Sequence, residues 1–218
     1  ARMLANRARA VVVSVGYRLA PEHPYPAALE DALAAVTWAA DEADALGADG
    51  GRLAVAGDSS GGNLAAAACL WARDHGGPTI AAQCLVYPVT DLEPDDGSWR
   101  EFGQGANLDA GDMEWFNANY AADPRRRAEP YASPLRAPDL SGLPPAIVAT
   151  ASHDILRDQG EAYARRLEGA GVAVFARRYE GLVHGFFRFS EVSPAARRAN
   201  EEICARLRAL LHGGGAPG

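Results

Sequence analysis

The sequence predicts an α/β fold, with a mostly parallel β-sheet and helices on both of its faces. Short apolar or β-branched runs alternate along the chain with longer segments of helical periodicity, which is the pattern of repeated strand–helix–strand units. The chain has 218 residues and is 48% apolar, which is enough for one domain with a sizeable core. We therefore treat residues 1–218 as a single domain.

Five segments have the length and composition of strands that are buried in such a sheet. They are 11–15, 53–56, 80–86, 146–150 and 172–179. The first of them, Val11 to Val15, is rich in valine, whose branched side chain packs well in a strand.

Helices are predicted between these strands. They are the end of a helix in 1–10, a helix that starts at Pro26, and helices over 63–73, 157–170 and from Pro194. The helix after Pro26 has one apolar face, formed by Leu29, Leu33, Val36 and Ala40. Gly171 can end the helix over 157–170, and Ser193 is a suitable cap for the last helix.

Residues 91–142 interrupt this alternation. The segment is rich in Asp, Pro and Gly and has one short helical stretch near 113–120. An irregular insertion between core elements is commonly a lid or a substrate-binding segment, and we predict such a role here.

Composition argues against several classes of partner. The formal net charge of −7 disfavours nucleic acid, because phosphate binding needs a basic face. No apolar run reaches membrane-spanning length, so no membrane partner is expected. Cys69, Cys84 and Cys204 lack the spacing of zinc ligands and lie in apolar stretches. Buried free thiols are therefore expected, which fits a reducing compartment such as the cytoplasm.

The motif that carries chemistry is Gly57-Asp58-Ser59-Ser60-Gly61, which matches the G-x-S-x-G pattern around a nucleophilic serine. A predicted strand runs into it and an Ala-rich helix runs out, so the residues beside the serine must be small. We expect Gly57 and Gly61 to let strand and helix approach closely, with Gly62 adding room. Ser59 would then lie at a helix N-terminus, where free N–H groups favour a developing negative charge. The alternative is a glycine-rich turn with a capping serine.

A serine nucleophile needs a base, and the base needs an acid to orient it. In α/β sheets such residues lie just past the carboxyl ends of strands. Asp154 follows the predicted strand at 146–150 and His184 follows the one at 172–179, which makes them the candidate acid and base. The other histidines are unsuitable by position: His23, His75, His153 and His212. The nearby Asp158 stays open as an alternative acid.

Four motifs in this order resemble the hormone-sensitive-lipase family of bacterial esterases, which have the α/β-hydrolase fold. They are Tyr17-Arg18-Leu19-Ala20-Pro21-Glu22-His23-Pro24, Gly57-Asp58-Ser59-Ser60-Gly61-Gly62, Asp154-Ile155-Leu156-Arg157-Asp158 and His184-Gly185-Phe186. The resemblance implies a Ser59–His184–Asp154 catalytic triad acting on small-molecule esters with short to medium acyl chains, without metal or cofactor. It also implies that the catalytic acid is Asp154, the first aspartate of its motif.

The sequence departs from the family pattern at Gly16, Ser60 and Ile155, none of which removes a catalytic group. A fourth departure concerns the oxyanion hole. Family members carry an H-G-G-G motif after an earlier strand, and none precedes Val11 here. The motif His212-Gly213-Gly214-Gly215 follows no strand, and we interpret it as a coincidental glycine tail, disordered from Gly213.

The chain is thus expected to begin partway through the fold, without the first strands and the strand that bears the oxyanion loop. Residues 11–15 and 53–56 should then lie apart without a ladder between them, and the N–H of Ser60 is the expected oxyanion donor. On this interpretation the chain alone folds poorly and loses at least ~10²-fold in turnover, because removing one oxyanion donor has about that effect.

The sequence favours a carboxylic-ester hydrolase, with an inactive fragment of one, or a non-catalytic ligand-binding protein on the same fold, as alternatives. The insertion resembles the substrate-binding region of the family, so Met113, Trp115 and Phe116 are predicted to line the acyl or alcohol pocket above Ser59. The alternative is that these side chains only pin the insertion to the core. A homodimer is left open.

Overall fold

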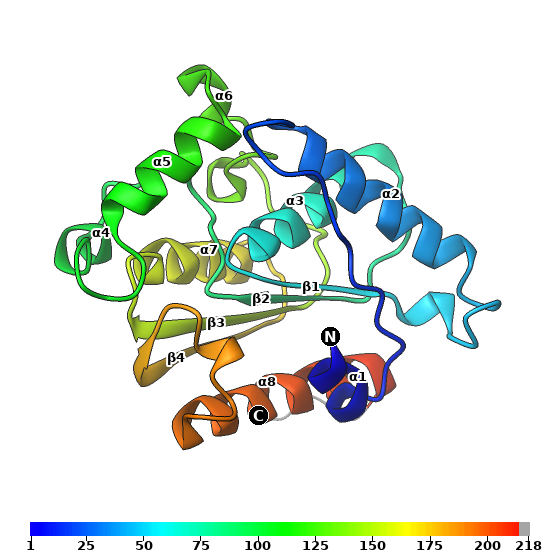
Figure 1. Ribbon diagram of the computed structural model, residues 1–218. Helices are drawn as coiled ribbons and strands as arrows, with labels where there is room; N and C mark the ends of the chain where they lie inside the picture. Colours follow the sequence, from blue (N-terminus) through cyan, green and yellow to red (C-terminus); the bar gives the residue numbers. More distant parts are fainter. Residues whose placement is uncertain (214–218) are drawn as a thin grey trace.

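The computed structural model describes residues 1–213, and its centre is a parallel sheet of four strands (Figure 1). The strands are β1 (Ala54–Asp58), β2 (Ala82–Val86), β3 (Ala146–His153) and β4 (Val174–Val183), in this order across the sheet. Each strand pairs in parallel with the next one along the chain. Parallel neighbours need crossover connections, which the helices provide.

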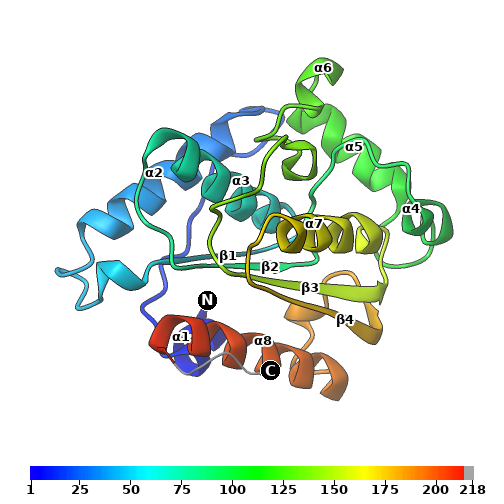
Figure 2. The ribbon, with the colours of Figure 1, turned by 180° about the vertical axis from the view of Figure 1, so that it is seen from behind.

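Helices cover both faces of the sheet, as Figures 1 and 2 show from opposite sides. One face is covered by α2 (Ala27–Asp41), α3 (Ser60–His75) and α7 (Arg157–Gly169), and the other by α1 (Arg2–Ala8) and α8 (Pro194–His212). Three single 3₁₀ turns lie at Gly50–Arg52, Pro134–Arg136 and Phe186–Arg188. The predicted fold class, a parallel sheet between two helical layers, is confirmed.

The insertion 91–142 contributes α4 (Gly97–Glu101), α5 (Ala110–Tyr120) and α6 (Pro124–Arg127). Helices α4 and α5 lie toward the carboxyl ends of the strands, on the side of the sheet that carries α3 and α7 (Figure 1). This places the insertion beside the end of the sheet where α/β proteins bind their ligands.

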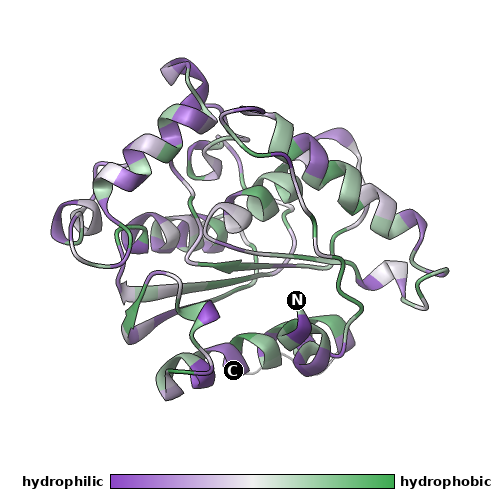
Figure 3. Ribbon diagram, in the orientation of Figure 1, coloured by the Kyte–Doolittle hydropathy of each residue, from purple (hydrophilic) through white to green (hydrophobic). Residues whose placement is uncertain are grey.

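The hydrophobic core has one cluster on each face of the sheet and a third under the insertion. Ile203 and Leu207 of α8 pack on one face, and Leu70 of α3 and Leu167 of α7 pack on the other. Figure 3 shows the same division, with hydrophobic residues along the central strands and hydrophilic ones on the outer sides of the helices. Burial of these faces is what drives the helices onto the sheet.

Both predicted helix boundaries are confirmed. The Ser193 hydroxyl accepts a hydrogen bond from the N–H of Ala196 at 3.2 Å, which caps α8. Gly171 follows α7 with φ +82°, and the N–H of Val172 donates to the carbonyl of Leu167 at 3.0 Å. This left-handed turn is one that glycine makes without strain.

The prediction of a buried strand at 11–15 is wrong. None of the three ladders of the sheet includes this segment, and Val11, Val13 and Val15 are 53%, 40% and 40% exposed. A β-branched composition favours a strand only where a neighbouring strand pairs with the backbone, and the described residues provide no such neighbour here.

The three cysteines are free and buried, as the sequence predicts. Burial raises the pKa of the Cys84 thiol to about 12 and lifts that of Cys69 well above its ordinary value. Within residues 1–213, no helix has both the length and the apolar character needed to cross a bilayer. The glycine tail beyond Gly213 lies outside the described residues.

Candidate active site

Ser59 lies in a tight turn between β1 and α3. Its backbone has φ +56° and ψ −118°, a conformation that residues with a side chain rarely adopt and that costs about 1–3 kcal/mol. Its N–H donates to the carbonyl of Val86 at 2.9 Å, and its own carbonyl accepts from the N–H of Val89 at 3.2 Å. The end of β2 and the segment after it therefore hold the strained residue through both its N–H and its carbonyl.

The close approach of strand and helix at this turn depends on Gly57 and Gly62. A β-carbon on Gly57 would lie 2.1 Å from the carbonyl oxygen of Gly61, and one on Gly62 would lie 2.8 Å from Cβ of Pro88. A β-carbon on Gly61 would meet nothing within 4 Å. The prediction that Gly61 needs to be small is therefore wrong, because its own position faces open space.

The structure brings Ser59, His184 and Asp154 into one hydrogen-bonded chain. His184 Nε2 lies 3.0 Å from Ser59 Oγ, and His184 Nδ1 lies 2.9 Å from Asp154 Oδ2. With the proton on Nδ1, the imidazole donates to Asp154 and accepts from the Ser59 hydroxyl. Asp154 is fully buried and His184 is 6% exposed, so water is largely kept from the His184–Asp154 pair, while Ser59 is partly exposed.

The carboxylate of Asp154 has a second donor. Its Oδ1 accepts a hydrogen bond from the N–H of Leu156 at 2.9 Å, while Oδ2 faces His184. Both oxygens of this buried group are therefore hydrogen-bonded, which is what a buried carboxylate requires. The loop after β3 thus presents the acid to the loop after β4.

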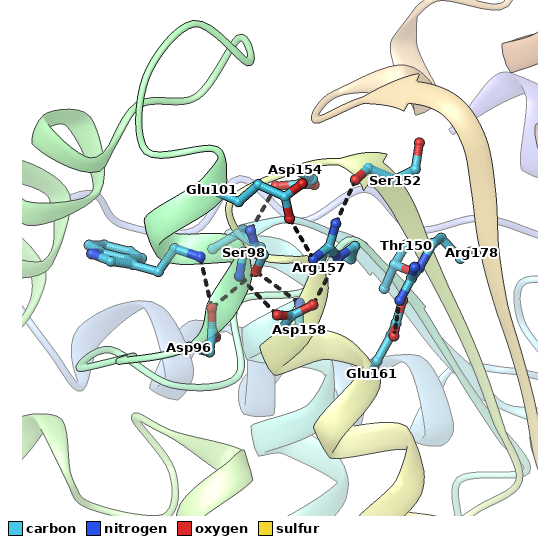
Figure 4. Close-up of polar contacts among 12 residues, drawn as sticks. Asp96, Ser98, Glu101, Thr150, Ser152, Asp154, Arg157, Asp158, Glu161 and Arg178 are labelled. Atoms are coloured by element: carbon cyan, nitrogen blue, oxygen red, sulfur yellow. Dashed lines mark hydrogen bonds and ion pairs between the residues drawn. The ribbon is translucent and has the colours of Figure 1, made fainter.

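The alternative acid, Asp158, has other partners. It lies in the first turn of α7, where its carboxylate accepts from Arg157 at 2.8 Å and from the N–H of Ser98 at 2.8 Å (Figure 4). Burial raises the pKa of Asp158, but these hydrogen bonds outweigh that effect and hold the pKa below its ordinary value. Another carboxylate near His184 in the chain, Glu180, is exposed on β4.

The remaining histidines lie apart from Ser59. His75 stacks on Trp71 with ring centroids 4.5 Å apart, and His153 Nδ1 lies 2.9 Å from the hydroxyl of Ser152. His212 ends α8, with Nε2 3.1 Å from the carbonyl of Ala8. His212, the first residue of the H-G-G-G sequence, therefore lies at the C-terminal end of α8 and contacts α1.

Ser60, the predicted oxyanion donor, is the first residue of α3. An α-helix leaves its first N–H groups without intrahelical acceptors, so the N–H of Ser60 is available to a ligand beside Ser59. Its hydroxyl lies 3.3 Å from the hydroxyl of Tyr17. The Tyr17 motif and the serine motif, 43 residues apart in the chain, thus meet at the site.

Tyr87 is a site residue that the sequence reasoning missed. Its ring centroid lies 4.6 Å from that of His184, and its hydroxyl donates to Asp58 Oδ2 at 3.3 Å. Burial raises the pKa of the Tyr87 phenol well above its ordinary value, so the group is a neutral donor. Tyr87 directly follows β2, and the rule that located Asp154 and His184 at strand ends could have found it.

The three predicted pocket residues, Met113, Trp115 and Phe116, differ in how far they are buried. Met113 is 3% exposed and packs in the cluster under the insertion, so it does pin this segment to the core. Trp115 and Phe116 are 60% and 49% exposed, and the centroids of their two rings lie 5.4 Å apart. The ring that packs against His184, tilted by 55°, is that of Tyr87, not one of these three.

Among residues 1–213, no group of three or more acidic, histidine or cysteine side chains is arranged to hold a metal ion.

Comparisons with known proteins agree with this geometry. A family model described as alpha/beta hydrolase fold matches residues 1–188. The chain is 46% identical over 216 residues to the carboxylic ester hydrolase LipN of Mycobacterium tuberculosis, covering 96% of this chain and 57% of LipN. It is 43% identical over 210 residues to the ethyl acetate hydrolase of Pseudomonas putida, covering 95% of this chain and 64% of that protein.

Solved structures give the same result. A thermostable esterase from Pseudomonas putida ECU1011 superposes with a TM-score of 0.93 at 44% identity, covering 97% of this chain and 67% of that one. The carboxylesterase EstE1, cloned from a metagenomic library, has a TM-score of 0.93 at 45% identity, covering 96% and 72%. This chain spans about three fifths of the length of LipN and of the ethyl acetate hydrolase. It belongs to the α/β-hydrolase fold family, within the hormone-sensitive-lipase group that its motifs resemble.

Proposed function

We propose that this protein is a carboxylic-ester hydrolase in which Ser59 is the nucleophile, His184 the general base and Asp154 the acid that orients it. The observation that carries the proposal is the continuous hydrogen-bonded chain, with 3.0 Å between Ser59 Oγ and His184 Nε2 and 2.9 Å between His184 Nδ1 and Asp154 Oδ2. A nucleophile, a base and an orienting group at these distances are the signature of nucleophilic catalysis by serine.

In the first half of the proposed reaction, the Ser59 hydroxyl proton moves to His184 Nε2 as Oγ bonds to the ester carbonyl carbon. The carbonyl electrons move to oxygen, and the N–H of Ser60 donates to this oxyanion. Asp154 accepts the Nδ1–H and stabilises the imidazolium. The intermediate collapses to an acyl-enzyme as the alcohol leaves with the proton from Nε2.

In the second half, water attacks the acyl-enzyme while His184 takes its proton. The second tetrahedral intermediate expels Ser59 Oγ, which recovers the proton from Nε2, and the carboxylic acid departs. The strained backbone of Ser59, held by its hydrogen bonds to Val86 and Val89, keeps Oγ in one place through both halves.

Short- to medium-chain esters are the proposed substrates. One relative is named for hydrolysis of ethyl acetate, an ester with a short acyl group. The free, buried thiols fit the proposed cytoplasmic location.

The proposal is tested by a fluorophosphonate probe together with a series of p-nitrophenyl esters from acetate to palmitate. We expect one label per chain, placed on Ser59 by mass spectrometry, because attack by Ser59 Oγ on phosphorus displaces fluoride. Turnover should be highest for the shorter esters. Labelling without turnover would favour the inactive-fragment alternative, and neither labelling nor turnover would favour a binding protein.

We further propose that Trp115 contributes to acyl or alcohol recognition. Trp115→Ala is expected to shift the ratio of kcat/KM between short and medium esters, while the unfolding temperature stays close to that of the unmodified protein. The side chain is 60% exposed, so its truncation removes little buried surface.

The matched control for Trp115 is Trp38→Ala, since Trp38 is also an exposed tryptophan, 47% exposed, but lies on α2 outside the insertion. The control should leave the ester preference unchanged. An unchanged preference in Trp115→Ala as well would remove this residue from the proposed pocket.

A further inference from the structure

One short part of the insertion contacts both of the loops that carry Asp154 and His184. We propose that residues 96–107, here named the brace, set the relative position of the acid and the base of the site. Ser98 acts on the loop after β3 and Asn107 on the loop after β4, so both are positioning residues. The inference rests on the proposed function.

The acid side of the brace is Ser98, which is fully buried. Its N–H donates to Asp158 Oδ2 at 2.8 Å, and its hydroxyl oxygen accepts from the N–H of Asp158 at 3.1 Å (Figure 4). The same hydroxyl lies 3.0 Å from the carbonyl oxygen of Ile155. Ser98 thus contacts the chain on both sides of Leu156, whose N–H donates to Asp154 Oδ1.

Further contacts attach the brace to the start of α7. Arg157 pairs with Glu101 at 3.2 Å, and its guanidinium lies over the ring of Phe102 at 5.0 Å from the centroid. Asp96 caps α4 by accepting from the N–H of Trp99 at 2.8 Å. Figure 4 shows Asp96, Ser98 and Glu101 gathered around Arg157 and Asp158, with Asp154 nearby.

The base side of the brace is Asn107. Its side-chain amide donates to the backbone carbonyl of His184 at 3.0 Å. Asn107 has φ +71°, a left-handed conformation that asparagine tolerates better than most residues. The next residue after His184 is Gly185, at φ +82°, where a β-carbon would lie 3.5 Å from the Asn107 amide nitrogen. The two turns are therefore neighbours, joined by the hydrogen bond from Asn107 to the His184 carbonyl.

The sheet itself is irregular at the place where the brace acts. Strands β3 and β4 pair in register up to Ala151 and Tyr179, and the register then shifts before His153 pairs with Val183. Asp154 directly follows His153, and His184 directly follows Val183. Regular pairing therefore ends at Ala151 and Tyr179, and one further pair, His153 with Val183, lies directly before the two catalytic residues. The brace adds contacts to both loops beyond this single pair. Catalysis is sensitive to displacements of about 1 Å at such groups.

The test is Asn107→Gly, which removes the amide but suits the left-handed backbone. We expect kcat for p-nitrophenyl acetate to fall about tenfold with KM within about twofold, the size of effect that loss of one hydrogen bond gives. The control is Asp95→Asn, since Asp95 is an exposed residue just outside the brace and its ion-pair partner is Arg100 on α4. The control should keep kcat, and both proteins should unfold near the temperature of the unmodified protein.

A double-mutant cycle separates positioning from general loosening. In an Asp154→Asn background, where the His184–Asp154 pair is already lost, Asn107→Gly should change kcat less than about twofold. The same fold-change in both backgrounds would overturn the proposal, as would an unchanged kcat in the single variant. Ser98→Ala provides a second cycle with Asp154→Asn, in which the fall in kcat should again be smaller in the Asp154→Asn background. The unfolding temperature of Ser98→Ala is measured alongside, so that a loss of stability is distinguished from a loss of positioning.

Failure of the inference and failure of the proposed function give different results. If the unmodified protein neither hydrolyses esters nor labels at Ser59, the proposed function itself is overturned. If it does both and the Asn107 and Ser98 cycles show no coupling to Asp154, only the brace is overturned.

Discussion

Replacing Ser59 by alanine is expected to lower kcat for p-nitrophenyl esters by about 10⁶-fold, the effect of removing the nucleophile from a serine hydrolase. Alanine keeps the β-carbon and so faces the same backbone conformation, at φ +56°, and the fold should be unchanged. His184 Nε2 loses its partner 3.0 Å away, and no acyl-enzyme can form. Steady-state kinetics and fluorophosphonate labelling measure the loss.

The matched control for Ser59→Ala is the neighbouring residue. Ser60→Ala keeps the backbone N–H that is proposed to bind the oxyanion and removes only an exposed hydroxyl, which lies 3.3 Å from that of Tyr17. We expect kcat within about threefold of the unmodified protein, since a surface hydrogen bond contributes little. Retention of more than a tenth of the activity by Ser59→Ala would show that turnover arises at another residue.

Replacing Gly57 by alanine is expected to destabilise the protein by about 4 kcal/mol or more, among the largest effects of a single substitution. The new β-carbon would lie 2.1 Å from the carbonyl oxygen and 2.2 Å from the carbonyl carbon of Gly61. Both are backbone atoms, so β1 and α3 would have to separate. The Ser59 turn lies between them, and activity should be lost together with stability.

The control for Gly57→Ala is Gly61→Ala. A β-carbon there meets nothing within 4 Å, and alanine is favoured over glycine inside a helix by about 1 kcal/mol. Gly61→Ala should therefore unfold at an equal or higher urea concentration than the unmodified protein. A Gly57→Ala variant with the same urea midpoint as the control would falsify the packing argument.

The sequence and the structure agree best where local chemistry decides. The Ser59 turn could be predicted because a strand, a glycine-bounded serine and an Ala-rich helix follow each other without a break. The strand-end positions of Asp154 and His184 follow from chain order in a parallel sheet. In contrast, the choice between Asp154 and Asp158 came from the family resemblance, because both lie within five residues of one strand end.

Other assignments depended on contacts that no local pattern encodes. The valines at 11–15 have the composition of a strand, but the described residues offer their backbone no ladder. Trp115 and Met113 lie two residues apart on α5 and have similar apolar character, yet only Met113 is buried. Each result depends on which surface lies opposite, and that surface comes from distant parts of the chain.

By itself, the sequence determined the α/β class, the turn around Ser59, the helix caps and the order of the candidate triad, since these depend on local propensity and chain order. Only the tertiary structure decided which glycine is crowded, which ring packs against His184, and that Ser98 and Asn107 reach the two loops. The physical reason is that these contacts join residues far apart in the chain, and their geometry is set by how β3, β4 and the insertion pack together.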